Sequence, residues 1–242
     1  MEFYDQLALD YDQMTGFDVR LEKEIEIFRV ILKRFPAKTI LDAGCGTGFH
    51  TVVLSRLNKE VTGIDNSEAM LTRAQENCRH WQVSPQFINA DFLNFSHKIQ
   101  TSFDAIFCLG NSFAHLLTVD LRLKVLQNFK RSLTAGGYIF LQIMNYDKIL
   151  IQRPHIFSIK EYDQVKYIRS YQYLPSTILF SVRIETPSGD RELTNELYPL
   201  QSDELYRLAV TSGFNNIIFF GDLSLSGYET TISDNICVLL SL

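Results

Sequence analysis

The spacing of apolar residues changes between two periods along the chain, and this alternation predicts an α/β fold. Between residues 37 and 145, short apolar runs typical of buried strands alternate with stretches in which apolar residues recur every three or four positions, as on one face of a helix. Strands that alternate with helices pair in parallel through right-handed crossovers, which gives a doubly wound sheet. We expect strands at 40–43, 61–65, 87–91, 103–109 and 138–144, and helices at 47–57, 67–78 and 118–133.

The segments on either side of this core extend the same pattern. An amphipathic helix is expected before Pro36, with apolar residues at helical spacing: Leu21, Ile25, Phe28 and Leu32. Near the other end, Ser202 is expected to cap a helix that Gly213 ends. Strands at 216–220 and 235–242 then bring the mostly parallel sheet to seven strands.

Residues 146–200 depart from this rhythm. Apolar and polar residues alternate from 178 to 184, the period of a half-buried antiparallel strand, and 166–173 and 192–198 are its expected partners. An insertion after the fifth strand emerges at the carboxyl ends of the parallel strands, so we expect a small antiparallel β lid over this edge. The chain would then form one domain, 1–242, with a core at 37–145, a lid at 146–200 and a last helix and strands at 201–242.

Composition narrows the class of protein. The chain has 242 residues, of which 46% are hydrophobic and 21% charged, as in folded globular proteins. The net charge of −5 argues against a nucleic-acid partner, and no apolar run is long enough to span a membrane. The four cysteines lack metal-ligand spacing and no signal peptide is visible, so we expect reduced thiols, no metal and a cytoplasmic location. The oligomeric state, monomer or homodimer, stays open.

A glycine-rich turn follows the first expected strand. Gly44, Gly46 and Gly48 alternate with other residues just before a helix, and their missing Cβ atoms would let a ligand lie against the backbone N–H groups. Phe49 stands where the dinucleotide fingerprint G-x-G-x-x-G needs its last glycine. The turn therefore favours a nucleotide-like ligand without choosing one, and a tight turn with no ligand is the alternative.

Polar residues stand at the ends of four expected strands. They are Asp42, Asp65, Asp91 and Asn111. In doubly wound sheets ligands bind beyond the carboxyl ends of the strands, so these side chains should gather at one edge.

Taken together, these motifs resemble class I S-adenosylmethionine-dependent methyltransferases over residues 37–145. Within that superfamily, the run 108–116 (Cys-Leu-Gly-Asn-Ser-Phe-Ala-His-Leu) and the triplet 145–147 (Asn-Tyr-Asp) resemble the glycine/sarcosine N-methyltransferase group. The resemblance implies a Rossmann-like methyltransferase fold, S-adenosylmethionine as the cofactor and a small-molecule methyl acceptor.

The resemblance also implies roles for individual residues. Asp65 would accept both ribose hydroxyls, Asp91 would accept the exocyclic amine of adenine, and Met70 and Phe92 would form apolar walls. The residues expected to line the methionine part of the cofactor are Asp42, Ala43, Gly44, Gly46 and Leu109. Tyr11 would close the pocket, and Arg20 is a candidate partner for the cofactor carboxylate. Ser112 would face both the cofactor and the acceptor. Asn111 would also face both the cofactor and the acceptor. The expected catalytic residues are Asn111, His115 and Tyr146.

Several of these residues have a structural alternative. Asp65 could cap the helix after Ser67, Met70 could be core packing, and His115 could be a capping or packing residue. The tyrosines of the lid could be ordinary sheet residues or could bind a cation: Tyr167, Tyr171 and Tyr173.

The chemistry favours an amine acceptor over a hydroxyl. Methyl transfer from a sulfonium is an in-line displacement in which alignment does most of the work, and a neutral amine needs no strong base. The sequence shows no obvious acid–base pair. A non-catalytic protein that binds S-adenosylmethionine or its product is the alternative, and an NAD-dependent enzyme is a third reading.

One departure from the resemblance concerns the acceptor. Glycine-methylating relatives carry an arginine immediately before Asn-Tyr-Asp that binds the substrate carboxylate, whereas this chain has Met144, which cannot donate a hydrogen bond. We therefore expect an acceptor that is not glycine bound in that manner. Candidate replacements for the arginine are Arg153, Arg169 and Arg183 in the insertion.

Overall fold

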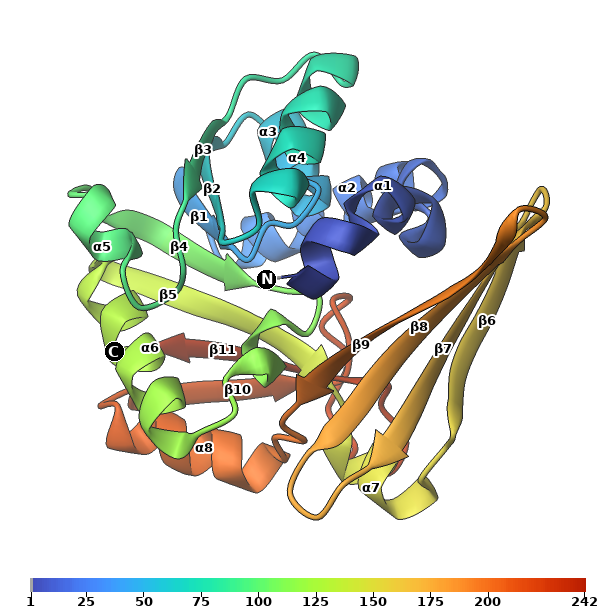
Figure 1. The fold of residues 1–242 in the computed structure, drawn as a ribbon. Coiled ribbons are helices and arrows are strands. Elements are labelled where there is room, and N and C mark those ends of the chain that lie inside the picture. The colour runs from blue at the N-terminus through green and yellow to red at the C-terminus, as the bar shows by residue number, and fades with distance from the viewer. Residues whose placement is uncertain (1) are drawn as a thin grey trace.

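The computed structural model describes residues 2–242 and contains two β-sheets (Figure 1). The larger sheet has seven strands in the order β10-β11-β5-β4-β1-β2-β3. Only β11 runs against its neighbours, so the prediction of a mostly parallel seven-stranded sheet is confirmed. The strands are β1 (Thr39–Ala43), β2 (Glu60–Asp65), β3 (Gln86–Asn89), β4 (Phe103–Cys108), β5 (Leu133–Met144), β10 (Asn216–Phe220) and β11 (Asn235–Ser241).

Helices cover both faces of this sheet. Alternate residues of β5 point to opposite faces, and both sets are buried, which explains its continuous apolar run. Ile139 packs in the cluster that contains α6 and α8, whereas Phe140 packs in the cluster that contains α2 and α3. The helices are α1 (Glu2–Thr15), α2 (Phe17–Arg34), α3 (Phe49–Arg56), α4 (Glu68–His80), α5 (Phe95–Lys98), α6 (Val119–Arg131), α7 (Tyr146–Gln152), α8 (Ser202–Thr211) and the 3₁₀ helix η1 (Ser112–His115).

The second sheet is a four-stranded antiparallel meander made of β6 (Ile156–Tyr162), β7 (Val165–Tyr173), β8 (Ile178–Thr186) and β9 (Gly189–Leu197). It stands beyond the carboxyl ends of β4 and β5 in Figure 1, on the side predicted for the lid. The sequence predicts three of its strands and misses β6. A register shift between Ile156 and Ser158 interrupts the alternation that would have revealed it.

Helix α1 lies between α4 and the second sheet (Figure 1). On one side the Asp12 carboxylate pairs with Arg73 at 2.8 Å and accepts a hydrogen bond from Asn77 at 2.9 Å, both on α4. On the other side Asp10 pairs with Arg191 of β9. The first helix therefore ties the large sheet's helices to the meander, over the edge where the strands end.

Two local predictions need correction. Strand β5 begins at Leu133 and runs through Gly136 and Gly137, so these glycines do not separate it from α6. Ser202 is the first residue of α8, and its N–H is bound by the Asp147 carboxylate at 2.9 Å, so Ser202 is not the cap.

None of the helices over residues 2–242 is long and apolar enough to cross a bilayer.

Candidate active site

The glycine turn between β1 and α3 adopts the conformation that its composition suggests. Gly44, Gly46 and Gly48 have φ values of 74°, 53° and 82°, in the left-handed region that favours glycine. A Cβ on Gly44 would lie 2.8 Å from Ser112 Oγ and 3.2 Å from Phe92 Cζ, whereas a Cβ on Gly46 would meet nothing within 4 Å. Ser112, at the start of η1, therefore packs closely against Gly44, whereas the space beside Gly46 is open.

The N–H groups of this turn are used inside the protein. Those of Gly44 and Cys45 donate to the Ile64 carbonyl at 2.8 and 3.0 Å, that of Gly46 donates to Asp65 Oδ2 at 2.8 Å, and that of Gly48 donates to the Cys45 carbonyl. A ligand at this turn therefore stays a prediction, and it would lie against N–H groups that already have acceptors within the protein. Because a pyrophosphate needs such donors, the turn suits the cationic amino-acid end of S-adenosylmethionine better than a dinucleotide.

Asp65, at the end of β2, combines two structural hydrogen bonds with spare accepting capacity. Its Oδ2 binds the Gly46 N–H, and its Oδ1 accepts from the Ser67 N–H at 2.9 Å, just before α4. Each carboxylate oxygen has a second lone pair that could accept a ligand hydroxyl. Burial raises the pKa of Asp65. The capping role and a ligand-binding role are therefore compatible in one side chain.

Asp42, at the end of β1, is a second buried acid at this edge. It is 2% exposed, and Thr51 Oγ1 donates a hydrogen bond to it at 2.6 Å. Burial, helped by the Asp65 charge and opposed by the Thr51 hydrogen bond, raises the pKa of Asp42 to about 7. The two strand ends thus concentrate acceptors where a cationic ligand would lie.

Asn111 and Tyr146 come together at the ends of β4 and β5. Asn111 has a φ of 74°; its Nδ2 donates to the Tyr146 hydroxyl at 2.9 Å, and its Oδ1 accepts from the Met144 N–H at 3.0 Å. Tyr146 is fully buried, and this burial raises its pKa well above the ordinary range. The pair is held rigidly and stays neutral at physiological pH.

The residues that flank Tyr146 have structural roles. The Asn145 amide donates to the carbonyls of Thr230 and Ser233 at 2.9 and 2.8 Å. The Asp147 carboxylate accepts from the N–H of Ser202 and from Gln201, both at the start of α8. Of the Asn-Tyr-Asp triplet, only Tyr146 bonds to a predicted site residue.

His115 is held by two residues that were not predicted. The Asn195 amide of β9 faces His115 Nδ1 at 3.3 Å, and the Tyr4 hydroxyl of α1 lies 2.7 Å from His115 Nε2. Because Asn195 Nδ2 can only donate, Nδ1 accepts, and neutral His115 carries its proton on Nε2 and donates to Tyr4. Burial lowers the pKa of His115 to about 4, so the ring is neutral at pH 7.

Tyr4 and Tyr11 reach the site from the same face of α1. Their ring centres lie 6.4 Å apart, and Tyr4 reaches His115 at the end of η1. Burial raises the pKa of both hydroxyls, and the Asp65 charge acts on both in the same direction. The sequence signal for Tyr4 was the seven-residue repeat of Tyr-Asp at 4–5 and 11–12, a spacing of two helical turns. Asn195 left no such signal.

Other predicted cofactor residues lie nearby with partners of their own. Arg20 pairs with Glu24 at 3.1 Å, and its guanidinium lies 4.5 Å from the ring centre of Phe49, beside the glycine turn. The Asp91 carboxylate accepts from the N–H groups of Leu93 and Asn94, so it caps its own loop. The remaining three are buried within apolar clusters: Ala43, Met70 and Leu109.

Met70 packs with α1 and the second sheet, in the cluster that contains Phe3, Leu7 and Val182. Phe92 packs edge-to-face on Phe129 while it reaches the glycine turn. The contacts of Met70 therefore agree with the core alternative, and those of Phe92 leave it at the edge of the site.

The arginines and tyrosines of the insertion divide into inward and outward groups. Arg183 pairs with Asp190 and Glu185 on an exposed surface, and Arg153 lies over Tyr173 at 4.6 Å. Arg169 is partly buried and in none of the ion pairs described for residues 2–242.

Tyr167 bonds to Asp10 and Gln13 of α1, and Tyr173 to the Pro154 carbonyl. Tyr171 packs in the core cluster that holds Tyr146.

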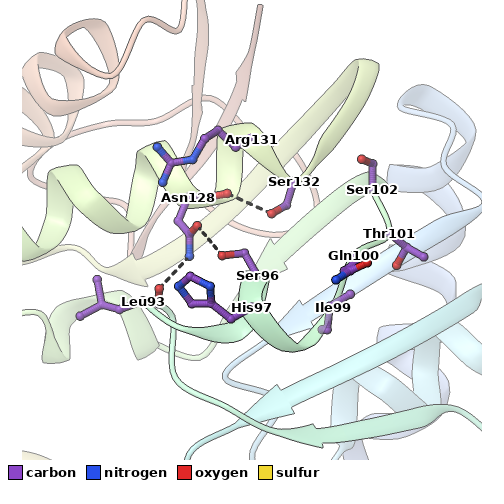
Figure 2. A pocket seen from close by; sticks show the side chains of 10 residues that line it. All are labelled: Leu93, Ser96, His97, Ile99, Gln100, Thr101, Ser102, Asn128, Arg131 and Ser132. Carbon is purple, nitrogen blue, oxygen red and sulfur yellow. Dashed lines mark hydrogen bonds between the residues drawn. The ribbon is translucent and has the colours of Figure 1, made fainter.

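A surface pocket of about 410 Å³ lies at the opposite edge of the sheet, where β4 and β5 begin (Figure 2). Two of its polar side chains bond to each other: Ser96 Oγ donates to Asn128 Oδ1 at 3.0 Å, and Asn128 Nδ2 in turn donates to the Phe92 carbonyl at 2.9 Å. No strand carboxyl end points into this pocket, so the candidate active site remains the opposite edge.

Comparisons with known proteins agree with the geometry. The family model described as a methyltransferase domain matches residues 40–137. The glycine/sarcosine N-methyltransferase of Aphanothece halophytica is 33% identical over 224 residues, which cover 91% of this chain and 83% of that protein.

Two solved structures share the fold. An S-adenosylmethionine-dependent methyltransferase from Clostridium acetobutylicum superimposes with a TM-score of 0.80 at 20% identity, over 99% of this chain and 98% of that one. An amino pentose methyltransferase from Micromonospora echinaspora, solved with S-adenosylmethionine bound, gives a TM-score of 0.71 at 18% identity over 97% of each chain.

Proposed function

We infer the reaction from one premise: this chain belongs to the family of the glycine/sarcosine N-methyltransferases and is an S-adenosylmethionine-dependent methyltransferase. When bound, S-adenosylmethionine supplies an already activated methyl group, so the protein has to align the acceptor and exclude water. We propose that the acceptor is the amine nitrogen of a small molecule, methylated by in-line displacement.

The observation that carries this proposal is the absence of a strong base beside Asn111 in the part of the chain that the structure describes. Tyr146 and Tyr4 have pKa values raised by burial, and neutral His115 has both ring nitrogens engaged. A hydroxyl acceptor would need one of these groups to take its proton, whereas an amine that enters unprotonated does not. The proposed roles are therefore hydrogen bonding to the acceptor by Asn111 and Tyr146 and positioning of Tyr4 by His115.

The residues at the strand ends fit the cofactor. Asp65 would accept from the ribose hydroxyls with its spare lone pairs, and the acidic surroundings of Asp42 would favour the ammonium and sulfonium charges. Arg20 lies beside the glycine turn, where it could pair with the cofactor carboxylate. The open space at Gly46 leaves room for the amino-acid part, with Tyr11, Phe92 and Ser112 around it.

The arrangement of the chain extends the proposal. Residues 1–242 would act as one methyltransferase domain in which the insertion and α1 form the lid over the acceptor. The four cysteines are free and buried, which is the basis for proposing a cytoplasmic location.

Matched pairs of acceptors test the proposal. Wild-type protein would be incubated with S-adenosylmethionine and either an amine or the alcohol of the same skeleton, such as glycine against glycolate, and release of S-adenosylhomocysteine would be measured. Turnover with amines and none with the matched alcohols is expected. Turnover with the alcohols alone would overturn the amine assignment.

A further inference from the structure

Arg169 occupies the middle of β7, on the face of the second sheet that points toward α1. In register it lies beside Ser158 of β6 and Val182 of β8, and Val182 is fully buried against α1. Its Nε donates to Ser158 Oγ at 2.6 Å, and its guanidinium lies 4.9 Å from the ring centre of Phe157. These two contacts fix the plane of the guanidinium and leave both Nη groups available.

No carboxylate of residues 2–242 pairs with Arg169. Its charged and titratable neighbours are Tyr11, Tyr171, Arg20 and Tyr162, and burial together with Arg20 lowers its pKa. Charges withdrawn from water are normally paired, because an isolated charge loses hydration without gaining a counterion. The Arg169 guanidinium is therefore a partly buried cation with no anionic partner among residues 2–242.

A second cation faces the same space. Lys160 of β6 lies on the inward face with Arg169, and its ammonium donates only to the Thr15 carbonyl, at 3.3 Å. The Thr15 carbonyl also accepts from Arg20 Nη1, at 3.5 Å, so Lys160 and Arg20 meet at one oxygen. Burial lowers the pKa of Lys160, and the charges of Arg169 and Arg20 act in the same direction. By contrast, the cations on the outer face are paired: Lys166 with Glu185, and Arg183 with Glu185 and Asp190.

Arg20 and Arg169 reach the site from different elements, α2 and β7. Arg20 stacks on Phe49 beside the glycine turn, the side proposed for the cofactor. Arg169 shares β7 with Tyr171, which packs in the same cluster as Tyr146, the side proposed for the acceptor. Met144 ends β5 just before the Asn-Tyr-Asp triplet, and its thioether cannot donate a hydrogen bond to an anion.

We propose that Arg169, assisted by Lys160, binds an anionic group of the methyl acceptor and so determines which acceptors are used. This inference rests on the proposed amine methylation. Two free Nη groups in a fixed plane match the geometry of a carboxylate, which they would bind bidentately. The acceptor is then an amine whose carboxylate lies against the second sheet rather than against the end of β5.

Kinetics with matched acceptors test this assignment. Sarcosine, glycine and β-alanine would each be compared with the corresponding primary amide, in wild type, Arg169→Met, Arg169→Lys and the control Arg183→Met, whose outer-face arginine is already paired. We expect wild type to prefer the acid over the amide about ten- to a hundredfold in kcat/KM. Arg169→Met should lose most of this preference through KM, Arg169→Lys should restore part of it, and Arg183→Met should keep it.

Direct binding measurements separate the possible failures. Calorimetry should give equal affinities for S-adenosylhomocysteine in wild type and Arg169→Met; a weakened affinity with an unchanged acid preference would make Arg169 a cofactor residue and overturn the proposal. Acetate should raise the melting temperature of wild type more than that of Arg169→Met, relative to chloride at equal ionic strength. If no amine is methylated, the proposed function fails, and equal acetate effects in the two proteins would overturn the anion site as well.

Discussion

Removing the Asp65 carboxylate should weaken both the fold and cofactor binding, by amounts that can be measured separately. Asp65→Ala leaves the N–H groups of Gly46 and Ser67 without their acceptor. An unpaired buried N–H costs ~1–3 kcal/mol, and Gly46 is partly open to water while Ser67 is 1% exposed, so we expect a loss of roughly 2–4 kcal/mol in the free energy of unfolding. Urea unfolding without cofactor measures this loss.

The second effect concerns the ribose hydroxyls. Without Asp65 they lose a charged acceptor, which should weaken S-adenosylhomocysteine binding by ~1–3 kcal/mol, about ten- to a hundredfold, in a calorimetric titration of the folded variant. Asp104→Ala is the matched control, because Asp104 also accepts two backbone N–H groups, those of Lys38 and Thr39, but at the opposite edge of the sheet. The control should lose stability and keep its affinity. Unchanged affinity in Asp65→Ala would remove Asp65 from the site.

Three further predictions follow from local geometry. Tyr146→Phe should lower kcat about tenfold while the affinity for S-adenosylhomocysteine stays constant, since it removes the hydroxyl that bonds to Nδ2 and Oδ1 of Asn111. An unchanged kcat in steady-state assays would argue against a role in alignment. The pKa of Asp42 is about 7 in the fold and 3.8 ordinarily, so protonated Asp42 stabilises the fold at low pH, and this contribution is lost as the pH rises through 7. Relative to Asp42→Asn, the free energy of unfolding of wild type in urea titrations should fall by ~2–4 kcal/mol between pH 4 and pH 8. A difference between the two proteins that does not depend on pH would contradict this. Gly44→Ala should destabilise more than Gly110→Ala by ~1–3 kcal/mol, because both have positive φ but only at Gly44 would the Cβ meet another side chain; equal melting temperatures for the two variants would refute the close approach.

The sequence predicts the large sheet well because its strands are long buried apolar runs between clear turn signals. The run 138–144 and the strand that ends in Asp65 are found from hydrophobicity alone. Strand β6 is missed because a register shift breaks its alternation, and the start of β5 is misplaced because Gly136 and Gly137 usually end an element. These errors come from local irregularities that hydrophobic periodicity does not encode.

The candidate site is predicted less completely, because contacts distant in sequence decide which polar groups are free. The glycine turn is found, but its N–H groups are occupied by Ile64 and Asp65, which no motif indicates. Tyr4 meets His115 across 111 positions of sequence, and Asn195 reaches the same ring from the insertion. Such partners depend on how α1 and the second sheet pack over the strand ends.

The measurement that tests the central claim most directly is the identity of the atom that receives the methyl group. Wild-type protein would be incubated with S-adenosylmethionine carrying a ¹³C-labelled methyl group and with glycine, sarcosine and a panel of other small amines, and the products would be analysed by NMR and mass spectrometry. We expect a labelled methyl group bonded to nitrogen, formed in equal amount with S-adenosylhomocysteine. A labelled methyl group on oxygen, or tight cofactor binding with no labelled product from any amine, would contradict it.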